Sequence, residues 1–214
     1  MQMITIALAK GRLADKSLDL LEQSGIDCSE VRSESRKLIF TTPDGSIRFI
    51  MVKPSDVPAY VEYGTADIGI AGKDTLLEEG RPLYEMLDLK FGKCKLAVAG
   101  YPERNNTGIT RSHIRVATKY PNITRNFFSS HGETVEIIKL NGSVELGPLT
   151  GLSDLIVDIV ESGRTLVENG LVVLEDVCPV SARLVVNQVS LKTRQNEIKV
   201  IIDGLRKLVE GEYQ

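Results

Sequence analysis

Short apolar runs alternate with amphipathic stretches along the chain, and this alternation restricts the folds that it can adopt. The apolar runs have the length of strands, and they are expected at residues 4–9, 38–41, 47–52, 66–72, 83–87, 95–99, 115–117, 135–140, 155–160 and 181–187. The amphipathic stretches have helical spacing, and they are expected at residues 13–24, 55–63, 73–79, 122–130 and 193–210. Strands and helices in this order predict an α/β fold with layers around mostly parallel sheets.

The chain has room for two lobes. Its 214 residues suffice for one large domain or two small ones. The most loop-like stretch is residues 102–108, and a second change comes at Cys178-Pro179, before the last strand and helix. We therefore expect a discontinuous first lobe of residues 1–90 and 181–214, and a second lobe of residues 91–180.

Composition argues against nucleic acid and membrane partners. The net charge of −3 provides no field that would attract nucleic acid, and the chain has no Trp. The first apolar run lacks the basic start and the cleavage site of a signal peptide, and no run approaches the ~18 apolar residues of a membrane span. Cys28, Cys94 and Cys178 form no Cys-x-x-Cys pair, which favours a reducing compartment. We expect a cytoplasmic protein.

Residues 154–166 combine a buried strand with a turn suited to anions. The turn consists of Ser162, Gly163, Arg164, Thr165 and Leu166. It can present consecutive backbone N–H groups and two hydroxyls to a phosphate. Asp158 and Glu161 would repel a bare phosphate, but carboxylates accept hydrogen bonds from a ribose diol. The pattern predicts a ribose-phosphate site; the alternative is a strand-to-helix turn that Ser162 and Thr165 merely cap.

Cations follow the first expected strand and two later ones. Lys10, Gly11 and Arg12 come directly after residues 4–9, where a glycine permits close backbone approach and two cations can clamp a polyphosphate. The alternative is an ordinary exposed turn. Arg36 and Lys53 lie near other strand ends, and each by itself is typical of a solvated surface charge.

Two glycines flank a short buried strand that runs into a helix. Tight packing explains Gly69 and Gly72 adequately, and a backbone contact between Gly72 and a nucleotide is the second interpretation. His113 and His131 have no partner at metal-ligand spacing, so no protein metal site is expected. The sequence also lacks the P-loop pattern of ordinary ATPases.

Taken together, several stretches resemble one family, the ATP phosphoribosyltransferases of histidine biosynthesis. The clearest match is residues 145–166. Supporting matches occur at residues 9–13, 56–58, 64–72, 91–94, 115–121 and 140–145. The resemblance extends from residue 3 to about residue 188, and Ala9 departs from it where many relatives have proline.

The resemblance implies a two-lobed periplasmic-binding-protein-like fold, with the active site in the cleft between the lobes. It also implies a reaction, in which ATP and phosphoribosyl pyrophosphate give N1-(5-phosphoribosyl)-ATP and pyrophosphate. Asp158 and Glu161 would hold the ribose diol, and the turn that ends at Leu166 would cradle the 5′-phosphate. The catalytic cations facing the pyrophosphate would be Lys10, Arg12, Arg36 and Lys53. The ATP contacts would be Gly11, Arg12 and Gly72.

The implied reaction needs no general base, because adenine N1 carries a free lone pair. Charge builds up instead on the departing pyrophosphate, where cations and Mg²⁺ stabilise it. Pyrophosphate oxygens and water would hold most of the Mg²⁺ coordination shell.

The family also implies partners. Long members carry a further C-terminal domain, whereas this chain ends at Gln214, so it resembles the short form. A short form is expected to be a dimer that joins a regulatory subunit similar to histidyl-tRNA synthetase. Two alternatives stay open: a phosphoribosyltransferase for another base, and a solute-binding module without chemistry.

Overall fold

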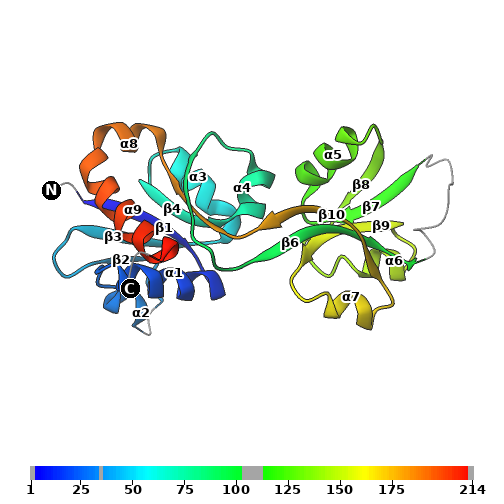
Figure 1. The fold of residues 1–214 in the computed structure, drawn as a ribbon, viewed down its shortest axis with the longest axis horizontal. Coiled ribbons are helices and arrows are strands. Elements are labelled where there is room, and N and C mark those ends of the chain that lie inside the picture. The colour runs from blue at the N-terminus through cyan, green and yellow to red at the C-terminus, as the bar shows by residue number, and fades with distance from the viewer. Residues whose placement is uncertain (1–2, 34–35, 103–112, 212–214) are drawn as a thin grey trace. The chain divides into compact units, whose positions relative to one another are not determined.

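The computed structural model describes residues 3–33, 36–102 and 113–211, and the chain divides into two compact units. Unit 1 combines Met1–Gly92 with Ser181–Gln214, and unit 2 is Lys93–Val180. Each unit has its own sheet with helices packed against it (Figure 1).

Unit 1 is built on a six-stranded sheet in the order β2-β3-β1-β4-β11-β5. Its strands are β1 (Ile4–Ala9), β2 (Ile39–Thr41), β3 (Ile47–Val52), β4 (Ile68–Gly72), β5 (Tyr84–Asp88) and β11 (Ala182–Val186). β1 pairs in parallel with β3 and β4, while β2 and β11 are antiparallel to their neighbours. Most strands therefore point the same way, as expected, although the pairings are mixed.

Helices cover both faces of this sheet. They are α1 (Arg12–Gln23), α2 (Ser29–Arg32), α3 (Val57–Glu62), α4 (Lys73–Glu79), α8 (Gln188–Thr193) and α9 (Gln195–Glu210), with a 3₁₀ turn, η1 (Pro54–Asp56). The large side chains of β1 pack with α1 and α9, and its alanines pack with α3. This division follows from the two-residue period of a strand. Among the described residues, no helix combines the length and apolar character that crossing a bilayer requires.

Unit 2 has a five-stranded sheet in the order β10-β6-β9-β7-β8. Its strands are β6 (Cys94–Gly100), β7 (Ile114–Thr118), β8 (Val135–Lys139), β9 (Leu155–Val160) and β10 (Val172–Val180), and its helices are α5 (Pro121–Ser130), α6 (Leu146–Leu149) and α7 (Arg164–Glu168). β9, β7 and β8 are parallel, and β6 is antiparallel to both β9 and β10. α5 and α7 lie on opposite faces (Figure 1), and each covers a separate hydrophobic cluster.

The expected helix at residues 193–210 is wrong at its start, because two helices meet there. The Asn187 side chain accepts hydrogen bonds from Val189 N and Ser190 N, so it caps α8. Arg194 then leaves helical geometry, with φ of −129°, and its Nη1 lies 2.7 Å from Asp67 Oδ2. This ion pair with a buried carboxylate fixes the break between α8 and α9.

β10 is the strand that the sequence did not predict. Glu175, Asp176 and Pro179 interrupt its apolar pattern, and its ladder with β6 contains irregularities. β10 is an edge strand, where the sheet tolerates proline and charged side chains. Of the loop expected at residues 102–108, all but residue 102 lies outside the described residues.

Candidate functional site

All the residues expected to bind a ribose phosphate line one pocket in unit 2. The pocket has a volume of about 250 Å³. These lining residues are Asp158, Glu161, Ser162, Gly163, Arg164, Thr165 and Leu166. The run therefore folds into a single concave surface, as a ribose-phosphate site requires.

The floor of this pocket is made by small side chains on β6. Ala97 lies opposite Asp158 in the antiparallel ladder, and Ala99 lies opposite Ile156. Because side chains alternate along a strand, Ile156 and Asp158 share one face of the sheet. The two alanines leave space above this face, and Asp158 borders that space at the end of β9.

The turn expected to bind an anion depends on the backbone of Gly163. This glycine has φ of 73° and ψ of 0°, in the left-handed region that L-residues avoid. The first hydrogen bond of α7 runs from Val167 N–H to the Gly163 carbonyl at 3.1 Å. N–H groups of the preceding residues are therefore not used by the helix, although Arg164 N–H donates to Ser162 Oγ at 3.4 Å.

The Arg164 side chain is engaged outside this cradle. Its Nε donates to Glu168 Oε1 at 2.7 Å, and the side chain is 83% exposed. The ion pair joins consecutive turns of α7. Arg164 thus lines the pocket, but in this arrangement its guanidinium is held by Glu168.

Glu145 is a pocket residue that the sequence analysis did not assign. It is half-buried, it precedes α6, and no hydrogen bond or ion pair of its side chain is found among the described residues. Gly147 allows α6 to approach the start of β9, since a Cβ there would lie 2.3 Å from Ser153 Oγ. The signal was present, because Glu145 begins the stretch that most resembles the family, but it lies far from the turn.

In unit 1, the residues expected to bind polyphosphate gather at the end of the sheet where the parallel strands β1, β3 and β4 finish. Lys10 follows β1 and Lys53 follows β3, and these parallel strands end in register, with Ala9 opposite Val52. Gly72 ends the adjacent parallel strand β4. Arg36 precedes β2, whose antiparallel pairing puts its start beside the end of β3. Open α/β sheets bind their ligands beyond the carboxyl ends of their parallel strands.

Only part of that set lines a common pocket. A cavity of about 570 Å³ is bordered by Lys10, Gly11, Arg36 and also Lys37, which the sequence analysis missed. Arg12, Lys53 and Gly72 are not among its lining residues. Lys37 could have been found as the neighbour of Arg36.

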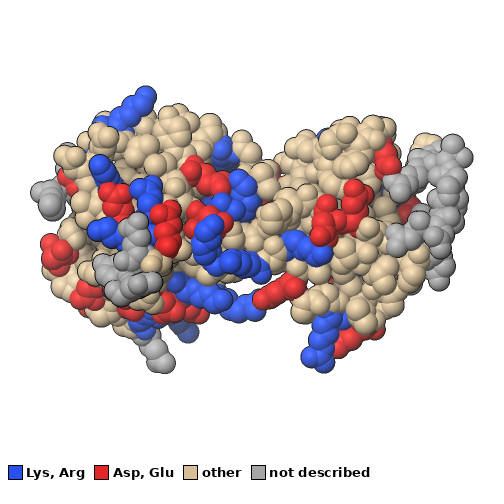
Figure 2. Space-filling view, viewed as in Figure 1, with Lys and Arg blue, Asp and Glu red and all other residues tan. Residues whose placement is uncertain are grey.

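The cations around this cavity differ in whether they form ion pairs with carboxylates. Arg32 borders it but lies 2.5 Å from Asp19 and 2.8 Å from Glu22. By contrast, no ion pair is found for Lys10 or Arg36 among the described residues. On the face shown in Figure 2, cations and carboxylates are interspersed. Lys10 and Arg36 are therefore the cations best placed to meet an anion in this cavity.

The three glycines of this region have different structural reasons. Gly11 has φ of 99° with open space where a Cβ would be, so its backbone conformation requires glycine. A Cβ on Gly69 would lie 2.6 Å from Val61 Cγ2, which confirms the packing interpretation for this residue. At Gly72, a Cβ would lie 2.1 Å from Asp74 Oδ1. Gly72 therefore lets a carboxylate fold over the backbone.

Within the described residues, no group of three His, Cys, Asp or Glu side chains is arranged to hold a metal ion. The described part of the chain thus offers no all-protein cage. A divalent cation would fit here only with most of its oxygen ligands coming from substrate and water, which is common for Mg²⁺.

The family model for ATP phosphoribosyltransferase matches residues 53–207. The ATP phosphoribosyltransferase of Ruminiclostridium cellulolyticum is 59% identical over 207 residues, covering 96% of this chain and 97% of that protein.

Two solved structures bear on the fold. An ATP phosphoribosyl transferase (HisG:HisZ) complex from Thermotoga maritima has a chain with a TM-score of 0.85 and 37% identity, covering 98% of this chain and 100% of that one. The substrate binding protein of an amino acid ABC transporter has a TM-score of 0.57 and 10% identity, covering 99% and 95%, so it shows the fold alone. The expected likeness to periplasmic binding proteins is confirmed. This chain belongs to the ATP phosphoribosyltransferase family.

Proposed function

We propose that this protein transfers the 5-phosphoribosyl group from phosphoribosyl pyrophosphate to N1 of ATP. The products are N1-(5-phosphoribosyl)-ATP and pyrophosphate, and the reaction is the first step of histidine biosynthesis. Family membership supports the reaction. The observation that carries the site is the single pocket formed by residues 158–166, in which carboxylates and an anion-binding turn lie together.

In this proposal the pocket of unit 2 binds the electrophile. Asp158 and Glu161 accept hydrogen bonds from the ribose hydroxyls, and Glu145 adds a third carboxylate from another segment. The backbone of residues 163–166 and the hydroxyls of Ser162 and Thr165 hold the 5′-phosphate. Because the N–H groups are fixed by the left-handed Gly163, little reorganisation is needed when the phosphate binds.

The cations of unit 1 act on the leaving group. The adenine N1 lone pair forms the new bond to ribose C1, while the C1–O bond breaks and its electrons leave with pyrophosphate. Lys10 and Arg36, with Arg12 and Lys53 at the same sheet edge, stabilise that negative charge. Gly11, Arg12 and Gly72 contact ATP. No proton has to leave N1 before attack, so a site without a poised histidine suits this step.

The metal in this proposal is Mg²⁺, bound mainly by pyrophosphate oxygens and water. It would supply further neutralisation of the leaving group. The part played by the chain is to position the anionic substrate with its own cations.

The proposed partners follow the solved Thermotoga maritima structure, which is a HisG:HisZ complex. We infer that this chain forms a dimer and joins a regulatory subunit that resembles histidyl-tRNA synthetase. We also infer a cytoplasmic location, to which three cysteines outside any disulfide are suited.

The test is incubation of the chain with ATP, phosphoribosyl pyrophosphate and Mg²⁺, with and without that subunit, while product absorbance is followed. Absence of turnover in both cases would contradict the proposal and favour a solute-binding module. Turnover with another base in preference to ATP would identify a different phosphoribosyltransferase.

A matched pair of variants assigns the pocket. Asp158→Asn is expected to weaken use of phosphoribosyl pyrophosphate more than binding of ATP. Asp176→Asn is the control, because Asp176 is exposed on β10 and pairs with Lys95 at 2.6 Å. If Asp158→Asn weakened use of phosphoribosyl pyrophosphate and binding of ATP equally, that result would contradict the role assigned to Asp158.

A further inference from the structure

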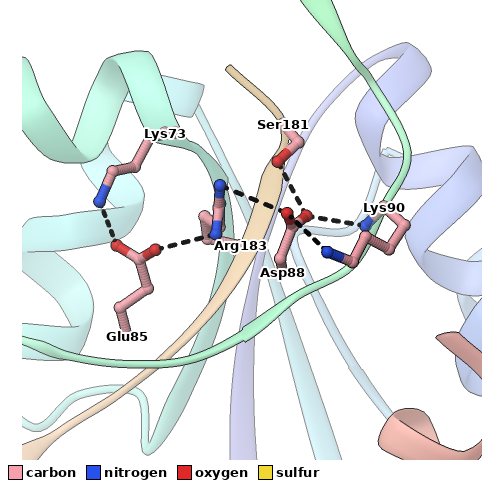
Figure 3. A network of polar contacts seen from close by, with 6 residues as sticks. All are labelled: Lys73, Glu85, Asp88, Lys90, Ser181 and Arg183. Atoms are coloured by element: carbon pink, nitrogen blue, oxygen red, sulfur yellow. Dashed lines mark hydrogen bonds and ion pairs between the residues drawn. The ribbon is translucent and has the colours of Figure 1, made fainter. Parts of the chain in front are cut away.

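A polar network in unit 1 is centred on Asp88, the last residue of β5 (Figure 3). The Asp88 carboxylate accepts hydrogen bonds from Ser181 Oγ at 2.8 Å and from Lys90 N at 2.9 Å. It also forms ion pairs with Lys90 Nζ at 3.2 Å and Arg183 Nη2 at 3.4 Å. One carboxylate therefore joins the end of β5 to the segment that enters β11.

The network continues through a second carboxylate, Glu85. Its oxygens lie 3.2 Å from Arg183 Nη1 and 2.5 Å from Lys73 Nζ. Arg183 thus bridges two carboxylates, and Lys73 closes the series at the start of α4 (Figure 3). Charges of alternating sign therefore hold three segments together.

The network lies at the end of the sheet where β4 finishes, and Gly72, the proposed contact for ATP, is the last residue of β4. In the β4–β11 ladder, Gly72 is opposite Ala182. The next N–H, that of Lys73, donates to the Ser181 carbonyl at 3.0 Å. Ser181 therefore holds the turn after β4 with its backbone, while its hydroxyl is held by Asp88.

We propose that Asp88 and Ser181 are positioning residues for ATP, which hold the turn at Gly72 and Lys73 in the geometry that ATP meets. The inference rests on the proposed function, in which Gly72 contacts ATP. Neither side chain is assigned to touch a substrate. Their effect is to fix a backbone segment, and a displacement of about 1 Å in such a segment is enough to weaken a substrate contact.

A matched control lies at the opposite end of the β4–β11 pair. Ser190 Oγ donates to Asp67 Oδ1 at 2.6 Å, and Asn187 N donates to the Asp67 carbonyl at the far end of the β4–β11 pair. Ser181 and Ser190 are both buried, with exposures of 5% and 7%. Ser181→Ala and Ser190→Ala each remove one hydrogen bond from a buried serine to an aspartate, but only the first lies beside Gly72.

The experiment compares these two variants with the unchanged protein in the presence of its regulatory subunit. Steady-state kinetics give KM for ATP and for phosphoribosyl pyrophosphate, thermal unfolding gives Tm, and hydrogen–deuterium exchange reports on residues 71–74. We expect Ser181→Ala to raise KM for ATP about fivefold or more, to change KM for phosphoribosyl pyrophosphate less than twofold, and to speed exchange at residues 71–74. Ser190→Ala should lower Tm similarly and leave both KM values within twofold.

Three outcomes would overturn the inference. These are unchanged exchange at residues 71–74 in Ser181→Ala, equal effects of both variants on KM for ATP, and a rise in both KM values together. The exchange measurement does not depend on turnover. Failure of the proposed function would instead appear as a lack of transfer by the unchanged protein, so the two failures are distinguishable.

A double-variant cycle isolates the hydrogen bond itself. If Asp88 acts through Ser181, Asp88→Ala and Ser181→Ala together should raise KM for ATP no more than the stronger single variant does. Multiplied effects would show that the two residues act separately, and would contradict the proposed path.

Discussion

The pocket in unit 2 is built mostly from one continuous run of residues, whereas the pocket in unit 1 joins segments that lie far apart in the sequence. In unit 2 the proposed anion-binding groups are backbone N–H groups fixed by one left-handed glycine. In unit 1 they are side chains on Lys10 and Arg36, brought together by strand pairing. A backbone site can be recognised from a short motif. A side-chain site depends on the register of the whole sheet.

The largest expected effect tests the side-chain site. Arg36→Gln should lower kcat on the order of 10²-fold, since it removes a cation that stabilises the leaving group. Arg32→Gln is the matched control, because Arg32 borders the same cavity but is already paired with Asp19 and Glu22. Its kcat should change less than about fivefold, in keeping with the small energies of exposed ion pairs. Steady-state kinetics give kcat for both variants. Equal losses of kcat would show that the ion pairs of Arg32 do not set its role apart from that of Arg36.

The next effect tests the backbone site. Gly163→Ala imposes strain of roughly 1–2 kcal/mol at a φ of 73°, so KM for phosphoribosyl pyrophosphate should rise about tenfold. Gly170→Ala imposes similar strain at a φ of 70°, but Gly170 lies after α7 and does not line the pocket. Both variants should lose comparable stability in urea titrations. If Gly170→Ala changed the KM equally, the effect would come from stability and not from the cradle.

A smaller effect concerns the acid sensitivity of unit 1. Burial by itself would raise the pKa of Asp88, but hydrogen bonds from Lys90 and Ser181 and the charge of Arg183 together lower this pKa below the ordinary 3.8. A carboxyl with a lowered folded-state pKa stabilises the fold above its unfolded pKa. That contribution is lost as pH falls below about 3.8 and through the lower folded-state value.

Urea midpoints measured between pH 7 and pH 2.5 check this effect. The unchanged protein should lose more stability over that interval than Asp88→Asn, which has no charge to lose at this position. Identical pH dependence in both proteins would contradict the assignment.

The smallest effect compares the thiols of the two units. Cys28 in unit 1 is 1% exposed, and burial, followed by the charge of Glu22, raises its pKa to about 12. Cys94 and Cys178 in unit 2 are only partly buried. Iodoacetamide under native conditions should therefore modify Cys94 and Cys178 before Cys28, since the thiolate is the reactive form. Peptide mass spectrometry gives the order, and early labelling of Cys28 would show that unit 1 opens first.

The sequence predicted the elements whose apolar pattern is regular. β1, β3 and β9 match their expected ranges because each is a short, nearly uninterrupted apolar run. β10 was missed because an edge strand can carry charges and a proline. The break at Arg194 was missed because it depends on Asp67, which is distant in sequence and adjacent only in the folded sheet.

The candidate site divides in the same way. The run from Asp158 to Leu166 could be predicted because its geometry is local. Glu145 could not be assigned from spacing, because its place in the pocket depends on where α6 packs. Lys53 and Gly72 lie where their strands finish, as the sequence predicted. A position at the end of a strand does not tell whether a residue lines the cavity, and neither of these two does.

The position of β11 between β4 and β5 has a consequence for synthesis on the ribosome. Unit 2 is continuous, so it can complete its fold once residue 180 has emerged. The sheet of unit 1 keeps an empty place at its interior until residues 182–186 arrive, although most of its strands were made first. The nascent chain must therefore keep the edges of β4 and β5 unpaired for the time needed to translate unit 2, and these edges are where a stalled or truncated chain is most exposed to aggregation.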